Sequence, residues 1–320
     1  MSTQEQIALA EATPVQATVP IATARPASLW RDTLGSVLRQ RSARVGLLLL
    51  TFLVLVAIFA PVIATHDPYQ SLLGVEPGVV KRSGPCIHLL GCPASQPEHI
   101  FGTDGNFRDL YSRVVYGART SLTVGVAAVT FAIVIGTIIG AIAGYMGGTS
   151  DNVLMRLMDV LLAFPALLLA IAIVTAAGRS LVNALIAIAI VSIPVYARIV
   201  RSTVLTTREA DFVTASKALG ESGFGILVRR IMPNSITPLI VAATLGVGGA
   251  VLEIAALAFV GVTGDVSNPE WGSIIGLERD QIFRAPHIIL IPGIAITITV
   301  LAFNLLGDGL RDALDPRLNR

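Results

Sequence analysis

The chain has 320 residues, of which 53% are hydrophobic and only 14% are charged. A soluble domain carries about 25% charged residues, so this composition excludes an ordinary soluble protein and indicates an integral membrane protein. The formal net charge of +2 is too small, and the basic residues are too dispersed, to indicate binding to nucleic acid.

The first 42 residues are polar and interrupted by proline, and no basic stretch leads directly into a short apolar core. We therefore expect residues 1–42 to form a partly disordered cytoplasmic tail rather than a signal peptide. Arg39, Arg41 and Arg44 come just before the first charge-free run, Val45 to Ala64, and we expect residues 43–64 to be an uncleaved membrane-spanning helix.

A long polar segment, residues 65–118, follows the first apolar run and contains Cys86 and Cys92, the only cysteines of the chain. On the outer face of a membrane, an even number of cysteines favours a disulfide. Two alternatives stay open, namely a pair of free thiols and a metal site that also uses His88 and His99. The spacing is not diagnostic of a metal site, and we assign no metal ligand.

Five further apolar runs are about as long as a bilayer requires. They are continuous rather than alternating and rich in small residues, which is typical of closely packed membrane helices and not of a β-barrel. The sequence therefore predicts an all-α integral membrane protein with about six transmembrane helices, the last five near residues 120–146, 157–178, 181–199, 234–262 and 286–307.

Basic residues predict how the chain is oriented. If the amino terminus lies inside, fifteen of the 23 Lys and Arg residues fall in segments on the inner side and eight on the outer side. The positive-inside rule therefore favours a cytoplasmic location for both termini, including the tail at residues 309–320. It also places the polar segment between the fourth and fifth apolar runs in the cytoplasm.

That cytoplasmic segment, residues 206–233, carries the start and stop signals of two short helices joined by a turn, and we call it the elbow. Thr206 and Glu209 fit a capping box at the start of a helix, and Gly220 is placed where a helix ends in a left-handed residue. Ser222 is a candidate cap for a second short helix that runs to Pro233. The first helix carries a narrow apolar or small-residue stripe at Phe212, Ala215 or Ser216, and Leu219. The pattern fits an ordinary surface connection or a helix that docks into a partner's groove.

The elbow resembles the EAA loop of permease subunits of ABC importers. It shows Thr214-Ala215-Ser216, then Gly220, then Ile231-Met232-Pro233, with Thr214 and Ser216 in place of the usual Glu and Ala. Its flanks, R-E-A-D-F-V-T-A-S-K-A-L-G and R-R-I-M-P-N, are similar to the dipeptide, oligopeptide and nickel transporter branch of that family.

Other stretches carry the same resemblance over most of the chain from Phe101 onward. They are F-G-T-D-G-N-F-R-D-L-Y-S-R-V-V-Y-G-A-R-T-S-L, M-R-L-M-D-V-L-L-A-F-P and N-L-L-G-D-G-L-R-D-A-L-D-P-R. In the first of these, Asn106-Phe107 replaces the glycine that usually precedes Arg108. We identify the chain as a member of this family of binding-protein-dependent permeases.

The resemblance implies a type I permease domain over residues 119–308, with a cytoplasmic coupling helix between the fourth and fifth spans. It also implies a site where this helix docks on an ATPase subunit, which we expect to comprise Glu209, Asp211, Phe212, Ala215, Ser216, Ala218, Leu219 and Gly220. An alternative for Phe212 and Leu219 is that they pack against the protein's own helices.

By the same resemblance, the partners are a second homologous permease, two P-loop ATPase subunits and an extracytoplasmic solute-binding protein, all at the cell membrane. The chain itself has no G-x-x-x-x-G-K-[ST] motif and no nucleophile with its base, so we expect no enzymatic activity. ATP and magnesium then belong to the partner subunits. The expected substrates are di- or oligopeptides, with nickel and sugars as alternatives. A secondary transporter is a rival class, but it predicts an intramembrane titratable cluster or an inverted repeat, and the sequence shows neither a cluster nor a convincing repeat. A membrane scaffold is the second rival, and it has no use for the elbow.

Two acidic residues lie in or near the apolar runs and are functional hypotheses by default. Asp159 is one helical turn from Arg156, so we expect a local ion pair between them. Glu253 has no such neighbour. It either lines the translocation pathway or bonds at the interface with the second permease, and we favour the interface.

Three prolines and one tryptophan complete the predictions. Pro165, Pro194 and Pro292 fall within apolar runs, where each is expected to interrupt or bend its helix. Trp271, in the last outer loop, is expected to anchor at the membrane interface.

Overall fold

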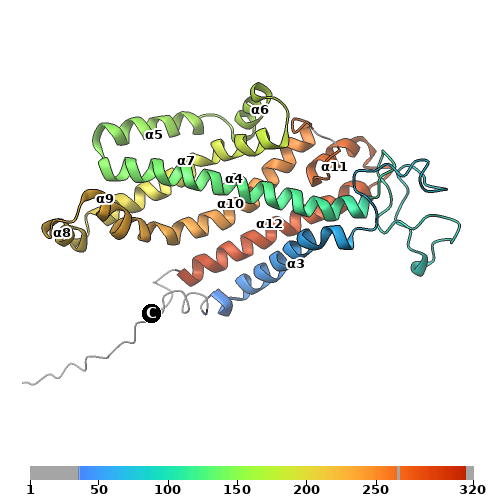
Figure 1. The fold of residues 1–320 in the computed structure, drawn as a ribbon, viewed down its shortest axis with the longest axis horizontal. Coiled ribbons are helices and arrows are strands. Elements are labelled where there is room, and N and C mark those ends of the chain that lie inside the picture. Colours follow the sequence, from blue (N-terminus) through green and yellow to red (C-terminus); the bar gives the residue numbers. More distant parts are fainter. Residues whose placement is uncertain (1–34, 36, 265–266, 315–320) are drawn as a thin grey trace, which may run out of the picture.

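The computed structural model describes residues 35, 37–264 and 267–314, and the fold over this range is an elongated bundle of long helices (Figure 1). Most of the expected amino-terminal tail and the last six residues of the expected carboxyl-terminal tail lie outside the described residues. The long helices are α3 (Arg41–Ile63), α4 (Leu110–Met146), α7 (Leu181–Arg208), α10 (Met232–Val260) and α12 (His287–Leu314). The shorter helices are α5 (Gly148–Leu162), α6 (Ala166–Ala177), α8 (Asp211–Ala218), α9 (Gly223–Ile226) and α11 (Trp271–Glu278).

Five of these helices, α3, α4, α7, α10 and α12, are long and apolar enough to cross a membrane. A sixth crossing exists only if α5 and α6 are taken together, since they meet at a bend of 92°. The all-α membrane architecture is therefore confirmed, and the interruption expected at Pro165 in the span at 157–178 is a break between two helices. Proline has no N–H to donate within a helix, and Pro165 stands at the N-cap of α6 after α5 has ended.

The other two prolines do not end their helices. Pro194 and Pro292 lie inside α7 and α12, which continue through them. The helix α7 also runs to Arg208, beyond the expected end at residue 199, and α4 begins at Leu110 rather than at residue 120. The helical ends are polar, so hydropathy alone marks only the apolar centre of each helix.

Glycines on α4 bring its backbone against that of α7. Gly136, Gly140 and Gly144 recur at a spacing of four and therefore share one face of the helix. A β-carbon at Gly140 would fall 2.3 Å from the Ala197 carbonyl oxygen, and one at Gly144 would fall 2.9 Å from the Val204 β-carbon. Small residues allow this close approach, which is typical of helix pairs in membranes.

The short helix α11 packs inside the bundle and begins at Trp271. The indole of Trp271 is buried, lies against Gly117, and donates a hydrogen bond of 2.9 Å from Nε1 to the Val114 carbonyl oxygen of α4. Gly272 of α11 lies against the Ala255 backbone of α10. The expected role of Trp271 as an interfacial anchor is therefore wrong, because its N–H is satisfied inside the protein.

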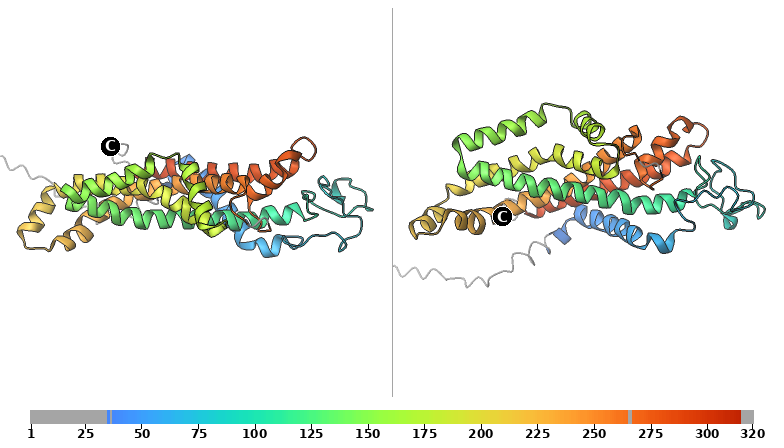
Figure 2. Two further views of the ribbon diagram at one scale, coloured as in Figure 1. Left: turned by 90° about the horizontal axis from the view of Figure 1, so that it is seen from above. Right: turned by 45° about the horizontal axis from the view of Figure 1, so that its top comes forward.

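The two ends of the bundle differ in character (Figures 1 and 2). The elbow formed by α8 and α9 projects from one end, and the start of α3 and the end of α12 lie toward that same end. The polar segment between α3 and α4 gathers at the opposite end, near α11.

Candidate coupling site

The junction between α7 and α8 forms without the expected capping box. Thr206 is still inside α7, where its hydroxyl donates to the Ser202 carbonyl oxygen at 3.0 Å. Glu209 accepts a hydrogen bond from Arg208 Nε at 2.9 Å, and Ala210 occupies the N-cap of α8 without a side-chain bond. The prediction failed because a threonine inside a helix satisfies its hydroxyl on the preceding turn.

The helix α8 turns one narrow face inward. Val213 and Ser216, three residues apart, are buried, whereas Phe212 is 48% exposed and Leu219 is 88% exposed. Leu219 therefore does not pack into the protein's own helices, whereas about half of Phe212 is covered by the rest of the chain. Ser216 is not on the exposed face, which corrects its expected place on a docking surface. The other expected docking residues are exposed, namely Glu209, Asp211, Phe212, Ala215, Ala218, Leu219 and Gly220.

Gly220 closes α8 in the left-handed conformation, with φ +81°. Its amide donates to the Lys217 carbonyl oxygen at 3.0 Å, and the Glu221 amide donates to the Ser216 carbonyl oxygen at 3.1 Å. These two bonds are the Schellman arrangement that satisfies the last carbonyl groups of a helix. A β-carbon at Gly220 would meet no described atom of this chain within 4 Å.

Ser222 is the N-cap of the next helix, α9, and its hydroxyl accepts a hydrogen bond of 3.2 Å from the Gly225 amide. Phe224 in the following turn is 77% exposed. A π-helical turn at Leu227–Ile231 joins α9 to α10, so the second helix does not end at Pro233 but continues into a membrane helix. Proline is tolerated there because the first turn of a helix has no intrahelical N–H bond to lose.

The elbow is fixed to the ends of the long helices. Arg208 at the end of α7 donates from Nη1 to the Gly144 carbonyl oxygen of α4 at 2.9 Å. Gly223 lies against the Tyr145 hydroxyl of α4, which a β-carbon would approach to 2.9 Å. The elbow therefore contacts the ends of α4 and α7 and continues into α10.

Two ion pairs fasten α5 to α7 near the elbow. Asp159 pairs with Arg198 at 2.6 Å and not with Arg156, so the expected local pair is wrong. Asp151 accepts both Nε and Nη2 of Arg201, the Nη2 bond being 2.6 Å. A pairing across two helices cannot be read from spacing within one helix.

Glu253 lies in α10 at a partly exposed position. Among the described residues it makes no hydrogen bond or ion pair.

At the opposite end of the bundle, Cys86 and Cys92 are joined by a disulfide with a Cα–Cα distance of 5.4 Å. Their sulfur atoms are therefore not metal ligands, which removes the alternative metal site built on them. The backbone of His99 pairs with that of Cys86, but its imidazole contacts Asp109, with Nδ1 at 2.9 Å from Oδ1.

Two buried acids at this end were not singled out by the sequence. Glu270 caps α11 and accepts from the Gly272 and Ser273 amides at 2.9 and 2.7 Å. Burial raises the pKa of Glu270, against the opposing effect of these hydrogen bonds. Glu278 pairs with Arg82 at 2.7 Å and so ties the polar segment to α11. An acid directly before W-G-S is the only local signal for the cap at residue 270.

The family profile of the binding-protein-dependent transport system inner membrane component matches residues 136–320. The chain belongs to this family. A second profile, the N-terminal transmembrane domain of oligopeptide transport permease C, matches residues 28–76. The resemblance found in the sequence is thus confirmed, and the chain is a multi-pass inner-membrane permease of the type I fold. The matched region begins at residue 136, whereas the resemblance placed the domain at 119–308.

Individual relatives agree over nearly the whole chain. The permease is 47% identical to the dipeptide transport system permease protein DppC of Alkalihalophilus pseudofirmus over 91% of each chain. It is 41% identical to the di/tripeptide transport system permease protein DppC of Pseudomonas aeruginosa, over 88% of this chain and 90% of the relative. It is 40% identical to the glutathione transport system permease protein GsiD of Escherichia coli, over 90% of this chain and 91% of the relative.

Proposed function

We propose that this permease is the membrane subunit of an ATP-driven importer. A second homologous permease completes the translocation path, an extracytoplasmic binding protein delivers the solute, and two P-loop ATPase subunits dock on the elbow. In this assembly the elbow and both termini face the cytoplasm, in keeping with the distribution of basic residues. ATP and magnesium bind in the ATPase subunits, and this chain does no chemistry of its own.

The observation that carries the proposal is the exposed apolar tip of the elbow. Leu219 and Phe224 are largely exposed, and Phe212 is about half exposed. Fully burying one such side chain contributes about 1.5–3 kcal/mol, so a partner surface that covers three of them gains substantial binding energy. A large exposed apolar patch of this kind marks an interaction site.

The attachment of the elbow supports a mechanical role. Val213 anchors α8 inward, and Arg208 bonds to the end of α4. Since α7 and α4 are in backbone contact along the Gly136–Gly144 face, a push on α8 moves two membrane helices as one body. The π-helical turn at Leu227–Ile231 is a place where α10 can adjust its direction.

The proposed substrates are short peptides. The named relatives carry dipeptides, di- and tripeptides, and glutathione, which is itself a tripeptide. Their similarity extends over about nine-tenths of the chain and is not confined to the elbow. Nickel and sugars remain the less supported alternatives from the wider family.

Glu253 supports the pairing with a second permease. A carboxyl group within a membrane helix is costly unless it finds a polar partner, and no described residue forms a hydrogen bond or ion pair with Glu253. We propose that the partner lies on the second permease, across the shared path.

The docking proposal is tested by purifying the assembled complex from native membranes and identifying its subunits by mass spectrometry. Gly220→Asp should lose the ATPase subunits because it places a charged side chain at the docking surface. Gly74→Asp is the matched control, since Gly74 also has a positive φ, +77°, and open space around its β-carbon, but lies in the polar segment at the other end. The proposal fails if both variants retain the ATPase subunits, or if both lose them.

A further inference from the structure

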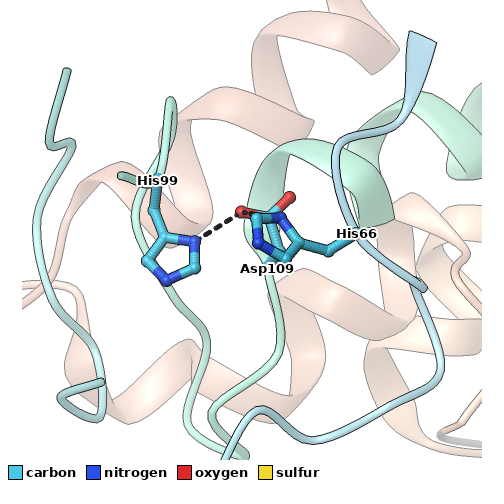
Figure 3. Close-up of side chains that lie close together, drawn as sticks. All are labelled: His66, His99 and Asp109. Atoms are coloured by element: carbon cyan, nitrogen blue, oxygen red, sulfur yellow. Dashed lines mark hydrogen bonds and ion pairs between the residues drawn. The ribbon is translucent and has the colours of Figure 1, made fainter. Parts of the chain in front are cut away.

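Two imidazoles and two carboxyl groups meet at the end of the bundle opposite the elbow. His66 follows α3, His99 lies in the segment that pairs with Cys86, and Asp109 is the N-cap of α4 (Figure 3). Glu76 comes from the loop between them. The rings of His66 and His99 are 5.1 Å apart between centroids. Four separate stretches of the polar segment therefore converge on one point.

Each imidazole has a carboxyl group on either side. At the Nδ1 side, Asp109 Oδ1 lies 2.9 Å from His99 and 3.8 Å from His66. At the Nε2 side, Glu76 Oε2 lies 3.5 Å from His99 and 3.7 Å from His66. Donor atoms of His66, His99 and Asp109 all lie within 4.8 Å of one another; Glu76 is not in that group, but its Oε2 lies within 3.7 Å of Nε2 of both imidazoles.

The Nε2 side has unsatisfied atoms. His99 is only 2% exposed, and its Nε2 has no hydrogen-bond partner; the same is true of the buried Glu76 Oε2 that faces it. Buried polar atoms are almost always hydrogen-bonded, so an orphaned pair that faces one another calls for an explanation. A cation bound between the two atoms satisfies both.

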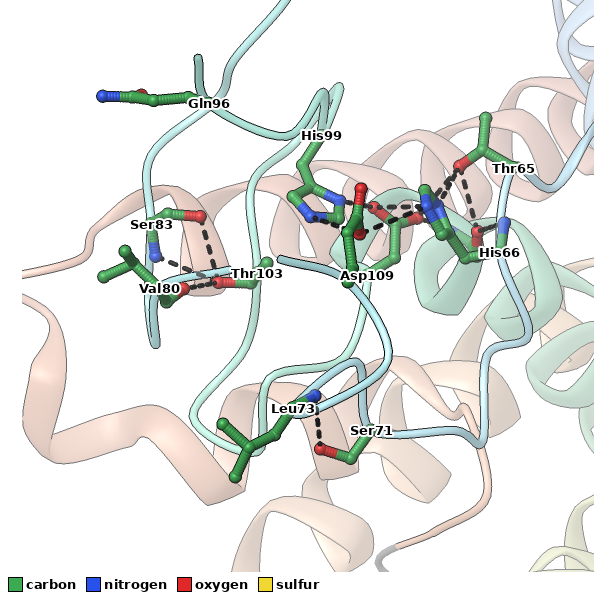
Figure 4. Close-up of polar contacts among 12 residues, drawn as sticks. Thr65, His66, Ser71, Leu73, Val80, Ser83, Gln96, His99, Thr103 and Asp109 are labelled. Carbon is green, nitrogen blue, oxygen red and sulfur yellow. Dashed lines mark hydrogen bonds and ion pairs between the residues drawn. The ribbon is translucent and has the colours of Figure 1, made fainter. Parts of the chain in front are cut away.

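The Nδ1 side is already arranged to orient the rings. The Nδ1–H of His99 donates to Asp109, which leaves the Nε2 lone pair directed toward Glu76. His66 Nδ1 lies 2.9 Å from the Thr65 hydroxyl, which in turn donates to Asp109 Oδ2 at 3.3 Å (Figure 4). A histidine that ligates a metal through one ring nitrogen and gives its other N–H to a carboxyl group is the usual arrangement at zinc sites.

We propose that His66, His99 and Glu76 bind a divalent transition-metal ion such as Zn²⁺, with Asp109 as the group that orients His99. Imidazole nitrogen and carboxylate oxygen are ligands that such ions prefer. With bonds of about 2.0–2.2 Å, tetrahedral ligand atoms are separated by roughly 3.3–3.6 Å. The observed nitrogen–oxygen distances of 3.5 and 3.7 Å are close to that separation.

The bound ion would join the end of α3 and the loop at residue 76 to the segment at residue 99. It would therefore complement the disulfide, which closes only residues 86–92 of this segment. The site lies at the other end of the molecule from the elbow and does not depend on the docking of ATPase subunits.

The test uses the full-length permease, purified in detergent without a polyhistidine tag and stripped with a chelator. Zinc chloride alone is then titrated by calorimetry, and the bound zinc is counted by elemental analysis. We expect one zinc ion per chain, and an affinity at least 100-fold lower for Glu76→Gln and His99→Gln. His88→Gln is the matched control, because His88 is in the same segment beside Glu98 but outside the cluster.

Thermal unfolding is a second measurement, and it separates a loss of zinc binding from a failure of one variant to fold. Zinc should raise the thermal unfolding temperature of the unaltered chain and of His88→Gln, but not of Glu76→Gln. Because the Glu76 side chain is partly exposed, its replacement by glutamine should disturb the fold little. The proposal is overturned if the unaltered chain binds no stoichiometric zinc, or if His88→Gln loses as much affinity as Glu76→Gln and His99→Gln.

Discussion

Gly140 of α4 lies against Ala197 of α7 so closely that the two helix backbones are in contact, with the Ala197 carbonyl oxygen 2.3 Å from the place of a Gly140 β-carbon. The same face of α4 carries Gly136 and Gly144, which contact α7 one turn away on either side. No rotamer change can relieve a clash with backbone, so a side chain here must separate the helices.

Gly140→Val should therefore destabilise the permease by about 1–3 kcal/mol or more, the usual cost of overpacking. The thermal unfolding temperature of the purified chain in detergent measures the effect. Gly249→Val in α10 is the control, since a β-carbon there would meet none of the described atoms within 4 Å outside the backbone of its own helix. Equal losses in the two variants would contradict a special role for the Gly140 contact.

Leu219→Ala should weaken the binding of ATPase subunits without affecting the fold. Leu219 is exposed in this chain, so truncation removes no internal contact but takes about 1–3 kcal/mol from a docked interface, or roughly 5- to 150-fold in affinity. The affinity of purified ATPase subunits for the permease is the measurement. Leu89→Ala, at an equally exposed leucine of the polar segment, should bind them normally. An unchanged affinity for Leu219→Ala would place the docking surface elsewhere.

Glu270 should make stability depend on pH. Burial raises the pKa of its carboxyl group, so the folded protein holds the proton more tightly than the unfolded chain does. Ionisation then costs stability progressively as pH rises above the unfolded value of about 4.3. Glu270→Gln is always neutral, so its unfolding temperature relative to the unaltered chain should be higher at pH 8 than at pH 5. Asp280→Asn, at an exposed side chain, should show no such trend, and a difference for Glu270→Gln that is independent of pH would contradict the account.

The disulfide should stabilise only the polar segment. Closing a loop of about seven residues contributes about 2 kcal/mol by the chain-entropy relation. Cys86→Ser with Cys92→Ser should therefore speed proteolysis of this segment and leave the unfolding temperature of the helical bundle nearly unchanged. A large loss of bundle stability would show that the loop supports the membrane helices.

The sequence predicted the family, the helical class and the left-handed end at Gly220, because these depend on composition and on patterns a few residues long. It predicted an interruption or bend at three prolines alike, but only Pro165 separates two helices, whereas Pro194 and Pro292 sit inside continuous helices. Whether a proline ends a helix depends on neighbouring helices that replace the lost bond.

Contacts between segments far apart in the chain could not be predicted from the sequence either. Trp271 was expected in the interface, yet its partner is Val114, 157 residues away. Asp159 was assigned to Arg156 within its own helix, but Arg198 on α7 is closer to its carboxyl group. The face of α8 was misassigned for the same reason, because only the packing of the elbow shows that Val213 and Ser216 point inward.

The most direct test of the importer account is solute uptake by the complete complex, reconstituted in vesicles with its binding protein and a labelled dipeptide. The account predicts uptake that requires ATP, persists when ion gradients are collapsed, and is lost with Gly220→Asp but retained with Gly74→Asp. Uptake by the permease alone, driven by an ion gradient in the absence of ATP, would contradict it.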